Sequence, residues 1–354
     1  MARQLNDNER EEIGALLTEQ DMTACDRLQS MFVDKDMPNF STMVLSDGCD
    51  PCATGFKTLD EFLQGGYSPG LHVIGALPSM GKTAFTLQMA IQMASMQTPV
   101  LYFSFESERI EIDARIISRL MHLQGYDMSI SQLMSATEIR NMENNPAAKG
   151  AYDSAMTQLR EMGDYMAIVE GYDKKQGNVL EYILHYCRAF EYLRCYIPVV
   201  FIDYLQLIAT LNNTTAMSDK QALDNVLQGL HDIAKYECKT QFILLSSFNR
   251  DAYSTIPTFA AFKESGNVEY YADTVAVLMP LELRSNAGNA NAIAQINRNI
   301  GEACPACLTI DMLKNRTGKR GAACDLEYYQ YCGEFVDCNA KYDTLGHGGK
   351  PSRI

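Results

Sequence analysis

The stretch LHVIGALPSMGKTAFTLQMA, residues 71–90, carries the clearest structural signal in the chain. Its apolar beginning, residues 71–75, has the length of a buried strand, and Gly81-Lys82-Thr83 opens a segment with helical periodicity. A strand that leads through a turn onto a helix N-terminus points backbone N–H groups and the positive end of the helix dipole at one place. We therefore interpret the turn as a phosphate-binding loop of the P-loop type.

The residue types in this turn match the chemistry of polyphosphate binding. The Lys82 ammonium is placed for the β- and γ-phosphates, and the Thr83 hydroxyl for Mg²⁺. The generic pattern has glycine six residues before the lysine, where this chain has Ala76. The residues that we expect to line the bound nucleotide are Ala76, Pro78, Ser79, Met80, Gly81, Lys82, Thr83 and Ala84.

Two later apolar runs end in an acidic residue. Residues 100–105 lead to Glu106, and residues 197–202 lead to Asp203. In an open α/β sheet, ligands bind at the carboxyl ends of the strands, so both carboxylates point to the nucleotide crevice. Glu106 is our candidate base for activating the attacking water. Asp203 is our candidate for holding Mg²⁺, directly or through water.

The rest of the chain alternates helical and strand patterns. This alternation predicts an α/β fold with a mostly parallel central sheet and helices on both faces. We expect a helical N-terminal segment and linker over residues 1–53, the compact domain over 54–335 and a flexible tail over 336–354. Residues 284–291 are expected to form a loop at a hairpin tip, 314–321 a basic turn, and 324–331 an edge strand.

Composition narrows the function class. The net charge of −14 argues against a generally basic nucleic-acid coat, although it leaves room for a local contact strip inside a ring or groove. No apolar run is long enough to cross a bilayer, and the N-terminus has no signal-peptide pattern, so we expect a cytoplasmic protein with no membrane contact.

The eleven cysteines leave two interpretations open. They are scattered through a long chain without an export signal, where thiols normally stay reduced. Two CxxC pairs, Cys49/Cys52 and Cys304/Cys307, have the ligand types of a four-thiolate zinc site but lie far apart in the sequence.

Seven motifs together resemble one family, the C-terminal motor domain of DnaB-type replicative helicases, which are hexameric rings with a RecA-like fold. The matching motifs, in the family's order, are TGFKTLDEFLQGG, ALPSMGKT, FSFESE, FIDYLQL, SSFNR, FKESGNVEYYAD and LKNRTG. Alanine in the first place of the phosphate loop is usual in this family. The family's separate N-terminal domain has no counterpart in this sequence, which we interpret as the layout of a phage or mobile-element relative.

The resemblance implies roles at the matching positions. Lys82 and Thr83 are similar to the phosphate and Mg²⁺ residues, Glu106 to the catalytic glutamate and Asp203 to the second acidic motif. Lys314 and Arg316 resemble the pair that reaches the nucleotide of the neighbouring subunit, where a cation supplied in trans couples hydrolysis to subunit position. The residues that match the family's DNA-facing loop and its surroundings are Arg250, Lys263, Glu264, Ser265 and Gly266.

Three positions depart from the family's pattern. Leu77 and Lys263 both stand where arginine is usual, and Ser247 stands where glutamine is usual. That glutamine is the polar group thought to sense the γ-phosphate and relay its state to the DNA loop. We therefore expect Ser247 to affect coupling more than nucleotide binding.

The resemblance implies an ATP-driven translocase that unwinds duplex DNA by pulling one strand through a homohexameric ring, with ATP and Mg²⁺ as cofactors. Backbone contacts to phosphates carry no base information, so binding to single-stranded DNA should be sequence-tolerant. A primase or a helicase loader is the implied protein partner. Two alternatives stay open, a RecA-like recombinase or regulatory ATPase, and a nucleotide-gated DNA-binding subunit with weak activity.

Overall fold

The computed structural model describes most of the chain from Pro51 onward. The described residues are 51–124, 137, 139, 148–172, 178–212, 218–248, 252, 255–262, 267–286, 289–299, 304–318 and 321–338, with residues 8, 11, 15 and 22 before them. The chain divides after Asp50 into two units. The second unit contains the sheet and every element named below.

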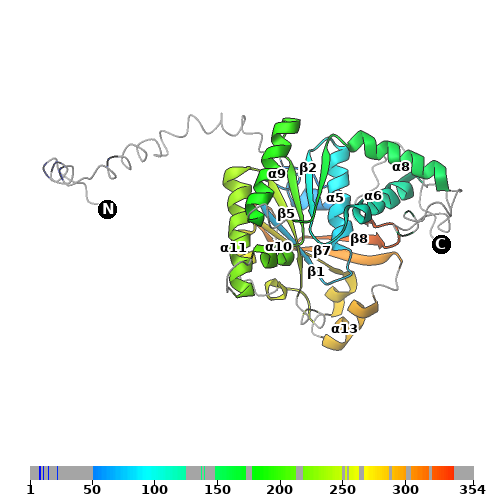
Figure 1. Ribbon diagram of the computed structural model, residues 1–354. Coiled ribbons are helices and arrows are strands. Elements are labelled where there is room, and N and C mark those ends of the chain that lie inside the picture. Colours follow the sequence, from blue (N-terminus) through cyan, green and yellow to red (C-terminus); the bar gives the residue numbers. More distant parts are fainter. Residues whose placement is uncertain are drawn as a thin grey trace. The chain divides into compact units, whose positions relative to one another are not determined.

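A nine-stranded sheet forms the centre of the described part of this second unit (Figure 1). Its strands run in the spatial order β3-β2-β4-β5-β1-β6-β7-β8-β9, in which the first six are parallel and the last three are antiparallel to their neighbours. The strands are β1 (Gly70–Ala76), β2 (Val100–Ser104), β3 (Met166–Glu170), β4 (Val199–Asp203), β5 (Gln241–Ser247), β6 (Thr274–Pro280), β7 (Ala306–Asn315), β8 (Ala323–Tyr329) and β9 (Glu334–Asp337).

Helices cover both faces of the sheet (Figure 1). Connections from β1 and β2 step one way across the sheet, and those from β3, β4 and β5 step the other way, so right-handed crossovers place their helices on opposite faces. The helices are α4 (Lys57–Phe62), α5 (Lys82–Ser95), α6 (Arg109–Gln124), α8 (Lys149–Met162), α9 (Val179–Arg194), α10 (Leu205–Asn212), α11 (Asp219–Asp232), α12 (Asn267–Tyr271) and α13 (Ala290–Asn299). Accordingly α5, α6 and α8 pack together, as do α9, α10 and α11.

Burial on both faces explains the continuous apolar runs of the parallel strands. Every residue of β1, β2, β4 and β6 is buried. A strand covered by helices on both sides has no solvent face, so its sequence shows no alternation. The predicted α/β fold with a mostly parallel sheet and helices on both faces is confirmed. Among the described residues, no helix is long and apolar enough to span a bilayer.

Three local predictions in the last third of the chain are wrong. The segment predicted as a hairpin tip contributes to a 3₁₀ helix (Leu281–Asn286) and to α13, because Leu283 and Ile293 pack into the core. Cys324 to Tyr329 lie in β8, which is not an edge strand because β9 pairs with its outer side. Lys314 belongs to β7 rather than to a turn, since β7 continues to Asn315 opposite β6.

Candidate active site

The carboxyl ends of four parallel strands bring the candidate residues together. In the order β2, β4, β5, β1, these ends carry Glu106, Asp203, Ser247 and the phosphate loop. The strand register pairs Ser104 with Asp203 and Ala76 with Ser247, so the ends are level. The Phe105 N–H also donates to the Asp203 carbonyl over 2.9 Å. Residues far apart in the sequence thus share one edge of the sheet.

The phosphate loop connects the end of β1 to the start of α5. Ala76 and Met80 are buried, whereas Pro78 and Ser79 at the crest of the loop are exposed. Gly81 has φ +81°, and a Cβ atom there would come within 2.8 Å of the Tyr328 ring of β8. Glycine is therefore required at this position both for its backbone conformation and for space.

The C-terminal strands support the loop helix from one side. The buried Gln88 amide of α5 donates to the Phe335 carbonyl over 2.8 Å and accepts from the Phe335 N–H over 2.7 Å. The Phe335 ring stacks on Tyr328 with centroids 4.1 Å apart and meets the Phe85 ring edge-on at 5.2 Å. Packing of β8 and β9 thus fixes where the first turn of α5 lies.

Lys82 extends along this edge toward β5. Its Nζ donates to the Ser247 Oγ over 2.5 Å. Burial lowers the pKa of the Lys82 ammonium, and the carboxylates of Asp203 and Glu106 act in the opposite direction. A cation with incomplete hydration is ready to exchange its protein partner for phosphate oxygens.

Thr83 and Asp203 meet directly. The Thr83 hydroxyl donates to the Asp203 Oδ2 over 2.7 Å. Burial raises the pKa of the Asp203 carboxyl, the Thr83 hydrogen bond lowers it, and the Glu106 charge raises it. A hydroxyl and a carboxylate in contact are hard oxygen ligands of the kind that Mg²⁺ takes, so these residues fit the ion implied by the sequence.

Replacement of Asp203 tests this description of its environment. A raised carboxyl pKa means that ionised Asp203 opposes folding at neutral pH and that this penalty fades as the pH falls toward its folded pKa. Asp203→Asn should therefore raise the Tm of the nucleotide-free protein at pH 7.5 by about 1–2 °C, which corresponds to about 1 kcal/mol for a chain of this length.

Scanning calorimetry at pH 7.5 and pH 5 measures this effect, and the Tm gain should shrink at the lower pH. The matched control is Asp164→Asn, whose carboxylate is exposed and pairs with Arg194 over 2.9 Å. This control should change the Tm little. A lower Tm for Asp203→Asn at pH 7.5 would contradict the raised pKa.

Gln206 was not assigned a role from the sequence, although it lies within the motif FIDYLQL. Its side chain accepts from the Ser247 N–H over 3.1 Å and donates to the Ser246 Oγ over 2.8 Å and to the Ser247 carbonyl over 3.2 Å. The first turn of α10 is therefore tied to the end of β5. The amide holds in place the backbone of the residue that contacts Lys82.

A cavity of about 290 Å³ lies against the flank of α5, one turn beyond the phosphate loop. It is lined by Ala84, Leu87, Gln88, Ile91, Arg115, Arg119, Thr137, Tyr328, Gln330, Tyr331, Cys332 and Gly333. Aromatic and guanidinium planes beside a phosphate loop are the groups on which a heterocyclic base stacks.

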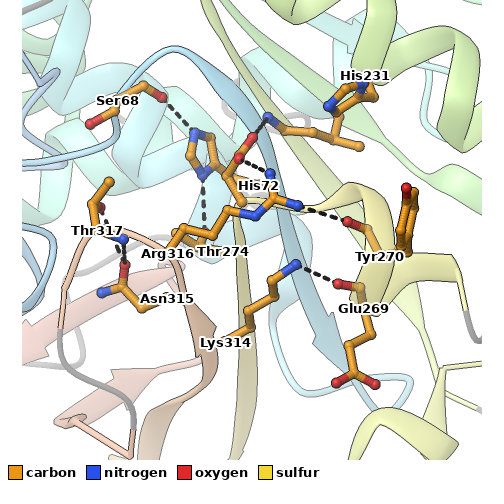
Figure 2. A network of polar contacts seen from close by, with 12 residues as sticks. Ser68, His72, His231, Glu269, Tyr270, Thr274, Lys314, Asn315, Arg316 and Thr317 are labelled. Atoms are coloured by element: carbon orange, nitrogen blue, oxygen red, sulfur yellow. Dashed lines mark hydrogen bonds and ion pairs between the residues drawn. The ribbon is translucent and has the colours of Figure 1, made fainter. Parts of the chain in front are cut away.

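Lys314 and Arg316 contact the residues of α12 (Figure 2). Lys314 Nζ donates to the Glu269 carbonyl of α12. Arg316 donates from Nη2 to the Tyr270 carbonyl over 2.9 Å and from Nη1 to the Asp273 Oδ1 over 2.7 Å. An open hollow of about 510 Å³ beside them is lined by Phe259, Asn267, Glu269, Tyr270, Leu313, Lys314 and Arg316.

The strand register places these cations at the opposite end of the sheet from the phosphate loop. Asp273, which holds Arg316, directly precedes β6. Its N–H donates to the Leu71 carbonyl, and its Oδ2 accepts from the Leu71 N–H at the start of β1. The phosphate loop begins after Ala76 at the other end of β1. Leu71 and Ala76 are five residue steps apart along β1, which corresponds to about 17 Å. The structure thus brings Lys82, Thr83, Glu106 and Asp203 together but not Lys314 and Arg316.

Two further predictions fall partly or wholly outside the described residues. Arg250, Lys263, Glu264, Ser265 and Gly266, the expected DNA contacts, all lie outside them, as does Cys49 of the first CxxC pair. Cys304 and Cys307 are exposed and carry no disulfide. Within the part of the chain that the structure describes, no cluster of three or more His, Cys, Asp or Glu is arranged to hold a metal ion.

Comparison with known proteins identifies the family. A family model described as the DnaB-like helicase C terminal domain matches residues 52–337. The replicative DNA helicase DnaB of Treponema pallidum (strain Nichols) is 28% identical over 227 residues, which cover 64% of this chain and 47% of that protein. The chain spans about half the length of the curated relatives it matches.

Solved structures share the fold. One of them, described as an ATPase domain, superposes with a TM-score of 0.68 at 22% identity, covering 86% of this chain and 98% of that one. A DnaB-like replicative helicase, described together with its interactions with primase, gives 0.66 at 22% identity and covers 86% of this chain and 66% of that one. With most of its length matched by the family model, the chain belongs to the DnaB-like helicase C-terminal domain family.

Proposed function

We propose that the protein is an ATP-dependent DNA helicase of the DnaB type, which hydrolyses ATP between adjacent subunits of a ring. The observation that carries this proposal is the separation of the two sets of residues. Lys82, Thr83, Glu106 and Asp203 share one end of the sheet, and Arg316 lies at the other end, about 17 Å further along the strand direction. A cation that cannot reach its own phosphate loop is available for the nucleotide of a neighbouring subunit.

The chemistry follows from the positions of the side chains. Lys82 would leave Ser247 for the β- and γ-phosphates, and Thr83 and Asp203 would hold Mg²⁺, which neutralises charge on the phosphates when bound. Glu106, exposed at the end of β2, would take a proton from the attacking water. Arg316 of the adjacent subunit would stabilise the charge that develops on the transferred phosphoryl group.

The cavity beside α5 would take the adenosine part of ATP. It adjoins the phosphate loop through Ala84, and its wall presents the Tyr331 ring and the Arg115 guanidinium. Stacking between an aromatic ring and a base is tolerant of base identity. Other nucleoside triphosphates should therefore also bind, with ATP as the expected substrate.

Family membership supports the proposal of DNA and protein partners. Arg250 and residues 263–266 would contact the phosphates of single-stranded DNA in the centre of a homohexameric ring, without reading the bases. A primase or a helicase loader is the proposed protein partner, as the relative described with primase indicates.

A forked-duplex assay tests the proposal. The protein with ATP and Mg²⁺ should displace one labelled strand from a fork, and single-stranded DNA of any sequence should stimulate ATP hydrolysis. A blunt duplex of the same sequence, which has no single-stranded tails, should not be unwound, because a ring needs a free strand to enclose. Strand exchange on protein filaments without fork displacement would instead indicate a RecA-like recombinase.

One contact favours a second candidate, a nucleotide-gated DNA-binding subunit with weak motor activity. Ser247 holds the Lys82 ammonium with a short side chain, where the family usually has the longer glutamine. Without that reach, the state of the γ-phosphate would be relayed less well to residues 263–266. Measurement of ATPase with and without single-stranded DNA decides, since this candidate requires DNA binding with no stimulation of hydrolysis.

A further inference from the structure

We propose that Asp273 is a positioning residue, which orients the Arg316 guanidinium for the neighbouring subunit's nucleotide and ties that cation to the start of its own β1. The inference rests on the proposed function, because it assumes that Arg316 acts in trans. It adds a residue, at the end of the motif FKESGNVEYYAD, to which the sequence assigned no role.

The strand register alone places Asp273 between the start of β1 and the end of β7. His72 of β1 pairs with Thr274 of β6, so the residues one step earlier, Leu71 and Asp273, are neighbours. Thr274 pairs with Asn315 of β7, so in the antiparallel direction Asp273 also lies opposite Arg316. A carboxylate at this position therefore meets both β1 and the end of β7.

Each polar atom of Asp273 has a partner on one of those two residues. Its N–H donates to the Leu71 carbonyl over 2.6 Å, and its Oδ2 accepts from the Leu71 N–H over 3.0 Å. Its carbonyl accepts from the Arg316 N–H over 3.1 Å, and its Oδ1 accepts from Arg316 Nη1 over 2.7 Å. One carboxylate thus links the backbone of β1 to the guanidinium.

The sequence of β1 makes room for this carboxylate. Gly70 has φ +144°, and a Cβ atom there would lie 2.2 Å from the Asp273 Oδ2. Any other residue at position 70 would displace the oxygen that accepts from Leu71. The glycine is thus matched to the carboxylate, which indicates that their close approach is a specific feature of this strand end.

His72, which Figure 2 shows in contact with Ser68 and Thr274, does not supply a positive charge to Asp273. The His72 Nε2 lies 2.7 Å from the Ser68 carbonyl, which only accepts, so Nε2 carries the proton and Nδ1 accepts from the Thr274 hydroxyl over 3.0 Å. Burial lowers the pKa of His72 to about 4, so the ring is neutral near pH 7. Arg316 therefore supplies the positive charge that contacts Asp273.

The arrangement leaves part of the guanidinium available. The Arg316 side chain is 42% exposed and borders the hollow beside α12, whereas the Asp273 side chain is 17% exposed. Nη1 and Nη2 each have further N–H donors, because a guanidinium carries five. Asp273 and the Tyr270 carbonyl thus fix the plane of the guanidinium and leave one further N–H on each of Nη1 and Nη2.

Mixing experiments with inactive subunits test the inference. The variant is Asp273→Asn, whose amide keeps one oxygen for Leu71 but removes the charge from Arg316. The matched control is Asp164→Asn, which breaks an exposed Asp–Arg pair of similar length elsewhere. We expect Asp273→Asn to bind a fluorescent ADP analogue like the wild type, with Tm nearly unchanged, and to lower kcat about 10–100-fold, as when a group that orients a functional side chain is lost. The control should keep its full rate.

Complementation then shows whether Asp273 acts on the phosphate loop of its own subunit or on the cation that serves the neighbouring subunit. Asp273→Asn mixed with Lys82→Ala should recover activity, because one of the two orientations of a mixed contact takes its phosphate loop from Asp273→Asn and its cation from Lys82→Ala, both of them intact. Asp273→Asn mixed with Arg316→Ala should not recover, and the double variant should be no slower than Arg316→Ala alone. Recovery with Arg316→Ala would show that Asp273 serves its own phosphate loop, which would overturn the inference.

A mixture of Lys82→Ala and Arg316→Ala distinguishes a failure of the proposed function from a failure of the inference about Asp273. If Lys82→Ala and Arg316→Ala do not complement each other, the cation in trans is wrong, and the role of Asp273 falls with it. If they do complement, but Asp273→Asn adds a further loss to Arg316→Ala, only the inference about Asp273 is overturned. Weaker ADP binding by Asp273→Asn alone would also overturn it, because the defect would then lie at β1.

Discussion

Lys82→Ala should lower the ATPase kcat about 10³-fold or more, because the Lys82 ammonium would stabilise charge on the transferred phosphoryl group. The loss should not come from unfolding. Burial lowers the pKa of Lys82, so its ionised form is less favourable in the folded protein than in the unfolded chain. The Tm of the nucleotide-free variant should therefore stay at or above that of the wild type.

The measurement is a coupled ATPase assay together with scanning calorimetry. Lys235→Ala is the matched control, since this lysine is exposed on the π-helix Ile233–Glu237 and has no part in the site. Control and wild type should hydrolyse ATP equally. Hydrolysis by Lys82→Ala within a factor of ten of the wild type would contradict the assignment of the phosphate loop.

Arg316→Ala should also stop turnover, with a loss of about 10³–10⁵-fold, the range for a cation supplied in trans to a phosphoryl group. Unlike Lys82→Ala, this variant keeps the whole phosphate loop, so its nucleotide binding should be unchanged. The affinity for a fluorescent ADP analogue should match that of the wild type. Normal turnover by Arg316→Ala would contradict the role in trans.

A mixture of the two inactive variants gives the sharpest test of a shared site. In a ring assembled at random from equal amounts, about a quarter of the contacts combine Lys82 from one subunit with Arg316 from the next. ATPase should therefore recover to about a quarter of the wild-type rate if contacts act independently. Size-exclusion chromatography before the assay shows whether rings have formed, and affinity capture through a tag on only one variant shows whether those rings contain both variants. No recovery from such rings would exclude a site made by two subunits.

The sequence predicts the residues around the phosphate loop because their signal is local. A strand, a small-residue turn and a helix start follow each other directly, and each acidic residue ends its own apolar run. The parallel sheet then brings Glu106 and Asp203 to Lys82, as neighbouring strands must. The pairing of Ser104 at the end of β2 with Asp203 at the end of β4 shows that these two strand ends are adjacent, as expected.

Gln206 and Asp273 could not be assigned in this way. The partners of Gln206 lie on β5 and those of Asp273 on β1 and after β7, so their contacts depend on strand order and register. Residues 284–291 were misread for a related reason. The asparagines and glycine of this segment are typical of loops, whereas the packing of Leu283 and Ile293 against the core favours helical structure at residues 284–286 and 290–291.

The support of α5 by the last two strands limits how far the polypeptide can be shortened for recombinant work. A stop codon after Tyr331 would delete β9 and strip the buried Gln88 amide of both its Phe335 partners. It would also remove Asp337, which accepts from the Thr58 N–H and hydroxyl at the start of α4. Truncations meant to retain ATP binding should therefore end no earlier than Cys338.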